Sequence, residues 1–392
     1  MRRLFGLNTL AGQLTLWTAL TVGVLLVLLL VSNYRTARDL IIRQTNAEAL
    51  VEVELHAVEI DTVMARVAAV VTSMAVRQAL RGDQPAPDVL DELRGLLDRF
   101  RPEEIFGIYY TFEGVDYRSP DSMPWVDRKS YPERVVNRNP YDIDQESTVW
   151  YWGPKKTRQL CYTEPYYDEG GSDVTMLSVN APMIGADGTF HGISGIDITL
   201  DDVQELVKKV DLDLVQQAGV VDDFAYLLSA KGKVIAHPDQ SLMMGPGNPG
   251  GDAADLPGGG AIMSAPQGFA EYGRGSGRRI VYWASVPSTG WRVVLDVPYK
   301  AVMAPVTELA WHSAGAGAAG LLFLLGVVTV VARRVAAPLQ KLTHAAAELE
   351  AGQLDRERLS PLLRRGDEVG DLGRAFTRMA EEIRKREESL AA

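Results

Sequence analysis

Two stretches of the chain carry no charged residue and are long enough to cross a lipid bilayer. The first, residues 4–34, contains the apolar run 14–31. The second covers residues 313–332 and ends at an arginine pair. A transmembrane helix needs about 20 mostly apolar residues to span roughly 30 Å of hydrocarbon. We therefore predict membrane helices at residues 12–32 and 312–332.

Each apolar stretch has an alternative interpretation. The first could be a cleaved signal peptide, but its apolar run is longer than a typical signal core. Residues 31–34 are also a poor cleavage site. The second could be a buried helix of a soluble protein, but the arginines that flank it weigh against that interpretation.

The flanking charges predict the orientation. Arg2 and Arg3 precede the first helix, whereas Arg333 and Arg334 follow the second. Because positive residues stay on the cytoplasmic side, both termini are predicted there. The long segment 33–311 is then extracytoplasmic. The small residues that open the second helix would permit close contact with a neighbouring helix.

A long helix is predicted to lead out of the membrane. Residues 33–79 contain neither Pro nor Gly, and their apolar positions recur mostly at spacings of three and four. These positions are Leu50, Val51, Leu55, Val58, Val63, Val67, Val70, Val71 and Met74. The glycine and prolines of residues 82–87 end the helix.

The pattern then changes to strands in two groups. The first group begins with a short helix at 89–100 and has strands at 105–112, 173–182 and 190–198. A turn at 187–188 joins the last two strands. A helix then runs up to residue 210, and Thr199 and Asp202 cap its start. The second group has strands at 225–229, 234–237, 279–285 and 291–297, with turns at 231–232 and 288–290. Residues 244–260 are rich in Gly, Pro and Asp and predict a mobile loop. No Lys-Ser/Thr follows these glycines, so they do not form a phosphate-binding motif.

Composition excludes several classes of function. The net charge of -11 argues against a nucleic-acid partner. The single cysteine, Cys161, cannot form an internal disulfide, and we expect it to be a small buried residue. The five histidines do not lie in a catalytic motif, and no spacing is typical of metal ligands. We predict no enzymatic activity in this chain, no cofactor and no metal.

The order of these elements resembles the double Cache sensor domain of bacterial chemoreceptors and sensor kinases. The residues that carry the resemblance are Trp150-Tyr151, Glu164 to Asp168, Asn180 to Met183, Asp187 to Phe190, Gly195 to Ile198 and Ser288 to Val293. The resemblance covers nearly all of residues 33–311. It implies an α+β fold in which a long helix supports two PAS-like antiparallel-sheet subdomains. The membrane-distal subdomain covers about residues 80–210, and the membrane-proximal subdomain covers about residues 220–300.

The resemblance also implies that the distal subdomain holds the ligand. Amino-acid receptors of the family grip the ligand carboxylate with an Arg two residues before the Trp-Tyr pair, and this chain has Thr148 there. They grip the ammonium group with a Tyr-x-Asp and a later Asp, which match Tyr166, Asp168 and Asp197. Thr carries no charge and cannot form a bidentate pair, so the ligand is expected to be an amine with or without a carboxylate.

The chemistry of these residues favours the same ligand class. We expect ligand contacts from Tyr109, Trp150, Tyr151, Tyr166, Asp168 and Asp197. Carboxylates beside aromatic rings favour a cationic or zwitterionic amine, through charge-assisted hydrogen bonds and cation–π contact. The alternative is that the aromatic residues are ordinary core and that Asp197 buttresses the end of a strand.

The cytoplasmic tail predicts two short helices with heptad spacing. Their seams place Leu339, Leu342, Ala346 and Leu349 on the first helix and Val369, Leu372, Phe376, Met379 and Ile383 on the second. With Pro338, the connector residues Gly352 and Leu354, and the run from Asp367 to Gly370, this tail resembles a HAMP relay module. The resemblance implies a parallel homodimer with a four-helix coiled coil. The alternative is an amphipathic helix pair without a relay role. We expect signal relay to depend on Pro338, Leu342, Glu368, Leu372, Phe376 and Met379.

These predictions describe a receptor of the inner (plasma) membrane. The predicted order is a cytoplasmic N-terminus (1–11), a membrane helix (12–32), the double Cache sensor (33–311), a second membrane helix (312–332), HAMP (333–387) and the start of an output linker (388–392). The output is expected from a catalytic or chemotaxis domain beyond Ala392, such as a histidine kinase, cyclase or phosphatase, or from a separate cytoplasmic partner. A third interpretation is a binding protein that serves a transporter, for which the heptad seams would be superfluous.

Overall fold

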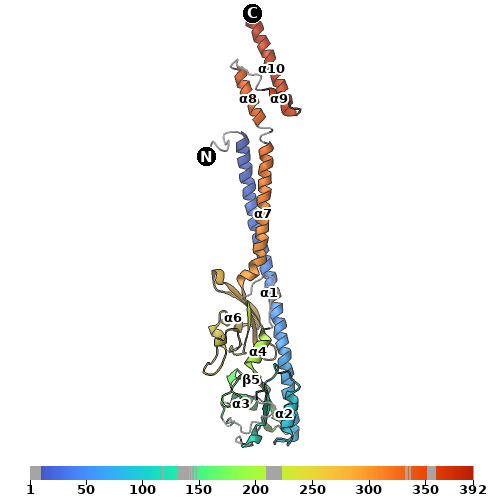
Figure 1. Cartoon of the computed structure of the whole chain (residues 1–392), viewed down its shortest axis with the longest axis vertical. Helices are drawn as coiled ribbons and strands as arrows, with labels where there is room; N and C mark the ends of the chain where they lie inside the picture. The colour runs from blue at the N-terminus through green and yellow to red at the C-terminus, as the bar shows by residue number, and fades with distance from the viewer. Residues whose placement is uncertain are drawn as a thin grey trace. The chain divides into compact units, whose positions relative to one another are not determined.

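The computed structural model describes residues 10–116, 119–129, 141, 143, 145–146, 148–208, 223–331, 334, 337–350 and 359–391. The chain divides into two compact units, residues 40–305 and residues 1–39 with 306–392. Figure 1 shows the order of the elements along the chain.

One helix, α1, runs from Leu10 to Arg81, so the predicted helix continues the membrane segment without a break. Its buried face in the sensor unit consists of Ala49, Val53, Ala57, Ile60, Met64, Val67, Val71 and Met74. Three apolar residues that we assigned to this face, Val51, Leu55 and Val58, are instead exposed. The helix carries two apolar stripes, and the one with the smaller side chains (Ala49 and Ala57) packs on the sheets.

The distal subdomain is a six-stranded antiparallel sheet. Its elements are α2 (Val89–Leu97), β1 (Gly107–Phe112), η1 (Pro120–Ser122), β2 (Trp125–Asp127), α3 (Val149–Thr157), β3 (Cys161–Tyr162), β4 (Tyr166–Tyr167), β5 (Thr175–Ile184), β6 (Phe190–Thr199) and α4 (Leu200–Val207). The strand order is β2-β1-β6-β5-β3, and β4 also pairs with β5. The predicted turn lies between β5 and β6, where Gly188 has a φ of +81°.

The two faces of the distal sheet differ in polarity because side chains alternate along each strand. One face packs against α1 and α2 and carries Ile108, Tyr110, Leu177, Val179, Ile196 and Ile198. The opposite face carries Tyr109, Ser178, Asn180 and Asp197. Polar groups are therefore concentrated on the face that α1 does not cover.

The proximal subdomain is a five-stranded antiparallel sheet of order β8-β7-β11-β10-β9. Its elements are β7 (Phe224–Leu228), β8 (Val234–Ala236), η2 (Gln240–Leu242), η3 (Ala253–Asp255), α6 (Gly259–Ser264), β9 (Gln267–Tyr272), η4 (Gly275–Gly277), β10 (Arg279–Ser285) and β11 (Arg292–Pro298). The four predicted strands are confirmed. Edge strand β9 was not predicted, because it is only half-buried and lacks a continuous apolar run.

Residues 244–260 contain more structure than a mobile loop would have. Gly245 and Asn248 exchange two backbone hydrogen bonds of 3.0 and 2.9 Å. Asp252 caps η3 through the backbone amide of Ala254. Cys161 also departs from expectation, since it is only half-buried and its sulfur lies 3.3 Å from the Thr157 hydroxyl.

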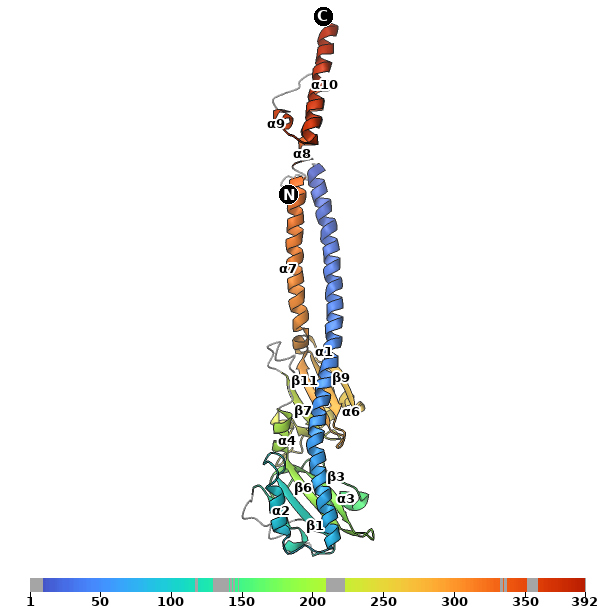
Figure 2. The same cartoon turned by 90° about the vertical axis from the view of Figure 1, so that its right-hand side faces the viewer.

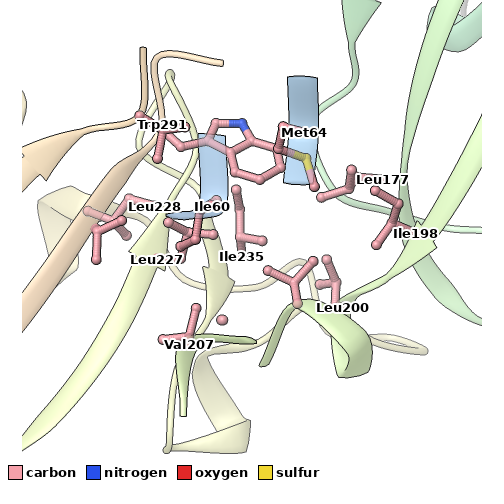
Figure 3. Packing of buried hydrophobic residues seen from close by; sticks show 14 of the residues in the cluster. Ile60, Met64, Leu177, Ile198, Leu200, Val207, Leu227, Leu228, Ile235 and Trp291 are labelled. Carbon is pink, nitrogen blue, oxygen red and sulfur yellow. The ribbon is translucent and has the colours of Figure 1, made fainter. Parts of the chain in front are cut away.

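The two sheets share one hydrophobic core, and α1 runs along both (Figure 2). Where the sheets meet, the core combines side chains from α1, both sheets and α4. Figure 3 labels Ile60, Met64, Leu177, Ile198, Leu200, Val207, Leu227, Leu228, Ile235 and Trp291 in this junction core. Neither sheet is therefore packed independently of the other.

The other unit holds the membrane-length helices and the tail. Helix α7 (Tyr299–Val331) and the start of α1 both have the length and composition to span a bilayer. The small-residue run allows close contact, since a Cβ on Gly317 would lie 3.2 Å from the Leu26 side chain. The tail forms α8 (Ala337–Glu350), α9 (Ser360–Leu363) and α10 (Glu368–Ala391). The predicted connector residues Gly352 and Leu354, and the predicted helix end at residue 210, lie outside the described residues.

Candidate ligand-binding site

The candidate site is built on the uncovered face of the distal sheet, around Asp197 on β6. Asp197 pairs with Gly107 on β1 and with Ser178 on β5. Its side chain is buried, and its carboxylate accepts a 2.6 Å hydrogen bond from the Ser178 hydroxyl. A Cβ on Gly107 would lie 3.1 Å from the Asp197 carboxylate and 2.9 Å from the Trp125 indole nitrogen. A side chain at this position would therefore displace the Trp125 indole or the Asp197 carboxylate.

Burial gives Asp197 an unusual protonation equilibrium. It raises the pKa of Asp197 to about 8, and the nearby carboxylates of Asp168 and Asp127 act in the same direction. The hydrogen bond from Ser178 opposes the rise but is too weak to cancel it. A positive charge beside Asp197 would favour the ionised carboxylate and reverse the shift.

Two further carboxylates lie near Asp197. Asp168 follows β4 and accepts hydrogen bonds of 2.7 Å from both the backbone amide and the hydroxyl of Ser172, as well as one from the hydroxyl of Tyr141. Asp127 ends β2 and is buried. Asp127 was not predicted as a site residue, because its strand is too short to show an alternating pattern.

Aromatic rings wall the same face. The Tyr109 hydroxyl donates a 2.6 Å hydrogen bond to the side-chain oxygen of Asn180. The ring of Trp150, on α3, stands edge-on to Tyr109 and Tyr141, with centroids 5.7 and 5.3 Å apart. Tyr166 and Ser178 lie 2.7 Å apart between hydroxyl oxygens, and Ser178 donates onward to Asp197. A polar chain therefore connects Tyr166 to the Asp197 carboxylate.

The structure brings together five of the six predicted ligand residues: Tyr109, Trp150, Tyr166, Asp168 and Asp197. The sixth, Tyr151, packs its ring against Trp150 at 6.2 Å between centroids, but its hydroxyl is hydrogen-bonded to the carboxylate of Glu113. Glu113 in turn pairs with Lys155 at 2.9 Å. Tyr151 thus supports the aromatic wall while its polar end is held elsewhere.

Two buried donors on this face have no hydrogen-bond acceptor in the described part of the chain. They are the indole nitrogen of Trp125 and the side-chain nitrogen of Asn180. The bond from Tyr109 fixes the Asn180 amide so that its nitrogen remains available. Buried donors without acceptors are costly, so they mark a place where a ligand acceptor would be stabilised.

The position at which the family resemblance implied an arginine is the residue before α3. Thr148 occupies it, and its carbonyl accepts 3.0 Å hydrogen bonds from the backbone amides of Tyr151 and Trp152. Thr148 therefore starts the helix that carries the aromatic wall. Among the described residues, no group of His, Cys, Asp and Glu side chains is arranged to hold a metal ion.

The predicted relay residues all lie on the tail helices. Pro338 and Leu342 are on α8, and both are buried. Glu368 begins α10, which also carries Leu372, Phe376 and Met379. Leu342 packs with Ala345, Leu359 and Leu362, and Phe376 lies against this cluster. Leu372 and Met379 are about half exposed, at 49% and 50%.

These features define a class: a membrane-anchored sensor with two sheet subdomains on one helix and a helical relay segment. The chain belongs to the Cache domain family, which it matches over residues 33–306, and it matches the HAMP domain over residues 330–385. Both families are sensory and signalling domains. The resemblance inferred from the sequence is confirmed.

Curated relatives are bacterial chemotaxis receptors. The methyl-accepting chemotaxis protein TlpQ of Pseudomonas aeruginosa is 24% identical over 320 residues, which is 71% of this chain and 44% of TlpQ. McpA of Bacillus subtilis is 26% identical over 230 residues, or 58% of this chain and 31% of McpA. The chain therefore spans less than half the length of these relatives.

Solved structures share the fold. The extracellular domain assigned to the histidine kinase mmHK1S-Z3 is 23% identical, with a TM-score of 0.54 over 69% of this chain and 98% of that domain. A structure of methyl-accepting chemotaxis protein X is 20% identical, with a TM-score of 0.51 over 65% of this chain and 98% of that chain. Sensors with different outputs therefore use this architecture.

Proposed function

We propose that the chain is the sensory part of a transmembrane receptor that binds a small amine in its distal subdomain, outside the cytoplasm. The observation that carries this proposal is the convergence of Asp127, Asp168 and Asp197, all buried, on one aromatic-walled face. Within the described residues, no Lys or Arg forms an ion pair with Asp168 or Asp197. A buried carboxylate without a counter-charge is unfavourable, and a cationic ligand would supply one.

The surrounding groups favour a small cationic or zwitterionic ligand. The rings of Trp150, Tyr109 and Tyr166 offer cation–π contact, worth about 1–2 kcal/mol each when desolvated. The donors of Trp125 and Asn180 would accommodate an acceptor on the same ligand, such as a carboxylate or hydroxyl oxygen. With Thr148 in place of arginine, affinity is expected to depend mainly on the amine.

A homodimer is part of the proposal because several seam residues of the tail are exposed among the residues that the structure describes. Leu342 and Phe376 contribute to a buried cluster, whereas Leu372 and Met379 remain about half exposed. The matching helices of a second copy would bury them as a four-helix coiled coil. Ligand would bias this bundle between two packings by its differential affinity for two states of the sensor.

The output is proposed by relationship rather than by a site. The chemotaxis receptors matched in sequence favour a chemotaxis output, and a histidine kinase is the second candidate. We expect no catalysis from this chain itself. Reading the coding DNA past Ala392 separates a fused output domain from a separate partner.

The ligand class is tested on the full chain in lipid nanodiscs. Amines, amino acids and dicarboxylates are screened by thermal shift, and hits are measured by calorimetry. An amine should bind, and Asp197→Asn should weaken it at least about tenfold, since about 1.4 kcal/mol of lost interaction suffices. Asp187→Asn, in the β5–β6 turn, is the matched control and should bind as the unaltered chain does. Tight binding of a dicarboxylate that Asp197→Asn leaves unchanged would refute the proposal.

The orientation is tested with the chain's single cysteine. A membrane-impermeant maleimide should label half-buried Cys161 on intact cells, after outer-membrane permeabilisation where such a membrane exists. A chain with Cys161→Ser and Met379→Cys should be labelled only after lysis. Labelling of both positions from the same side would contradict the predicted topology.

A further inference from the structure

The two sheets of the sensor are built alike, strand for strand. The distal order β2-β1-β6-β5 corresponds to the proximal order β8-β7-β11-β10. Strand β6 carries Asp197 three positions before Leu200, the first residue of α4. Strand β11 carries Asp296 three positions before Tyr299, the first residue of α7. Asp296 is therefore the proximal counterpart of the candidate ligand-binding carboxylate.

The first neighbouring strand extends this correspondence. On the distal sheet, β1 places Gly107 opposite Asp197, and Tyr109 follows two positions later. On the proximal sheet, β7 places Phe224 opposite Asp296, and Tyr226 follows two positions later. Tyr109 and Tyr226 thus occupy equivalent sheet positions, and both are buried.

The strands on the other side supply a second matching tyrosine. Distal Tyr166 pairs with Met176, which in turn pairs with Thr199. Proximal Tyr272 pairs with Arg279, which in turn pairs with Pro298. Because Thr199 and Pro298 each lie two positions after the strand's aspartate, Tyr272 is the counterpart of Tyr166.

The two sites differ at three positions: Gly107 against Phe224, Ser178 against Val281, and Met176 against Arg279. Only the last of these differences introduces a charge. The Arg279 Nε donates a 2.6 Å hydrogen bond to the Asp296 carboxylate, and the Tyr272 hydroxyl donates to the same carboxylate. The Arg279 guanidinium also lies 5.3 Å from the centroid of the Phe224 ring. The proximal carboxylate is thus satisfied by a cation from its own chain, held against an aromatic ring.

We propose that the proximal subdomain holds a second copy of the distal cation site, formed by Asp296, Tyr226 and Tyr272, and that Arg279 fills it as a built-in ligand. Removing the Arg279 side chain would then create a site for a small alkylguanidinium ion on Asp296. The comparison with the distal site rests on the proposed amine-binding function, but the proximal contacts stand on their own. They also explain why only one of two similar sheets would respond to an external amine.

The experiment replaces the side chain with a soluble mimic. Ethylguanidinium has the atoms that Arg279→Ala removes, and ethylurea is a neutral analogue of similar shape. The full chain in nanodiscs is compared as the unaltered protein, Arg279→Ala, Arg279→Met and the double variant Arg279→Ala with Asp296→Asn. Arg279→Met reproduces the residue found at the distal position. The readout is the thermal unfolding midpoint as a function of probe concentration.

Ethylguanidinium should raise the midpoint of Arg279→Ala saturably, because it binds the folded state only. The unaltered chain and the double variant keep the same distal site, so any midpoint shift in them should be equal and smaller than that of Arg279→Ala. Ethylurea should have no effect on any chain. Arg279→Met should respond less than Arg279→Ala, since methionine fills part of the vacated space.

Several results would overturn the proposal. One is a folded Arg279→Ala chain that does not respond to ethylguanidinium, and another is an equal response from the double variant or to ethylurea. Failure of both single variants to fold even with ethylguanidinium would also count against it, since the mimic would then not replace the side chain. The distal site is identical in all four chains, so the difference between Arg279→Ala and the double variant reports on the proximal site alone. Failure here and failure of the proposed function are therefore distinguishable.

Discussion

Asp197 makes the stability of the sensor depend on pH in a direction opposite to that of most carboxylates. Burial raises its pKa from 3.8 to about 8, so the folded chain holds this proton more tightly than the unfolded chain. The contribution of Asp197 to folded-state stability therefore falls as the pH rises from about 4 to about 8, and levels off above that. The perturbation that isolates this effect is Asp197→Asn, which keeps the shape and can still accept the bond from Ser178.

The magnitude follows from the two pKa values. Each unit of separation corresponds to about 1.4 kcal/mol, so at pH 7 the buried carboxyl costs the folded state on the order of 4 kcal/mol. Between pH 4 and pH 8, the stability of the unaltered chain should fall by about 1.4 kcal/mol per pH unit relative to Asp197→Asn. The difference in pH slope between the two chains is the quantity to compare, because the contributions of the other titrating groups to the free energy of unfolding are the same in both chains and cancel.

The assay is denaturant unfolding of both chains, followed by tryptophan fluorescence, at several pH values across this range. Asp187→Asn is the control, because hydrogen bonds from Thr189 lower the pKa of Asp187. Its contribution has the opposite sign and is lost as the pH falls. An amine ligand at saturation should reduce the slope of the unaltered chain, since a cation favours the ionised carboxylate. Parallel pH profiles for the unaltered chain and Asp197→Asn would refute the reasoning.

Three further predictions concern the candidate site and the tail. Gly107→Ala should weaken amine binding at least about tenfold, measured by calorimetry, because the added Cβ would crowd the Asp197 carboxylate. The control Gly95→Ala, on α2, should bind normally because its Cβ would have nothing within 4 Å. Met176→Arg should place a cation in the distal site, as Arg279 does in the proximal one, and should abolish amine binding. Met176→Leu should preserve binding. Unchanged binding in the arginine variant would contradict the equivalence of the two sites. In a chain with Cys161→Ser, Leu372→Cys should form a disulfide between two copies, whereas Lys385→Cys, on the opposite side of α10, should not. Gel mobility under oxidation measures the cross-linking, and equal cross-linking of the two variants would count against the proposed seam.

Much of the fold could be predicted from local pattern. Alternation located β5, and the turn at residues 187–188 located β6. The Thr199 cap marked the start of α4, since the backbone amide of Asp202 donates to its hydroxyl. These features depend on residues that are close together in the sequence, so local sequence patterns predict them. The membrane-length helices were equally clear, because water-soluble folds rarely leave so long a span without a charged residue.

Features set by distant neighbours could not be predicted. Helix α1 has two apolar stripes, and only packing decides that Ala49 rather than Val51 faces the sheets. Asp127 joins the candidate site because β2 lies beside β1, and nothing in its own short strand indicates this pairing. The pairing of Arg279 with Asp296 likewise depends on the register of two strands.

The junction core in Figure 3 has a consequence for how this receptor is handled. A fragment cut between the sheets would expose side chains such as Leu177, Ile198 and Leu228, so its ligand affinity would not represent the intact sensor. Thermodynamic reciprocity requires that if ligand in one sheet changes the packing of the other, a change in that other sheet alters ligand affinity to the same degree. A substitution or a partner that perturbs the proximal sheet would then change the concentration at which a ligand of the distal sheet acts.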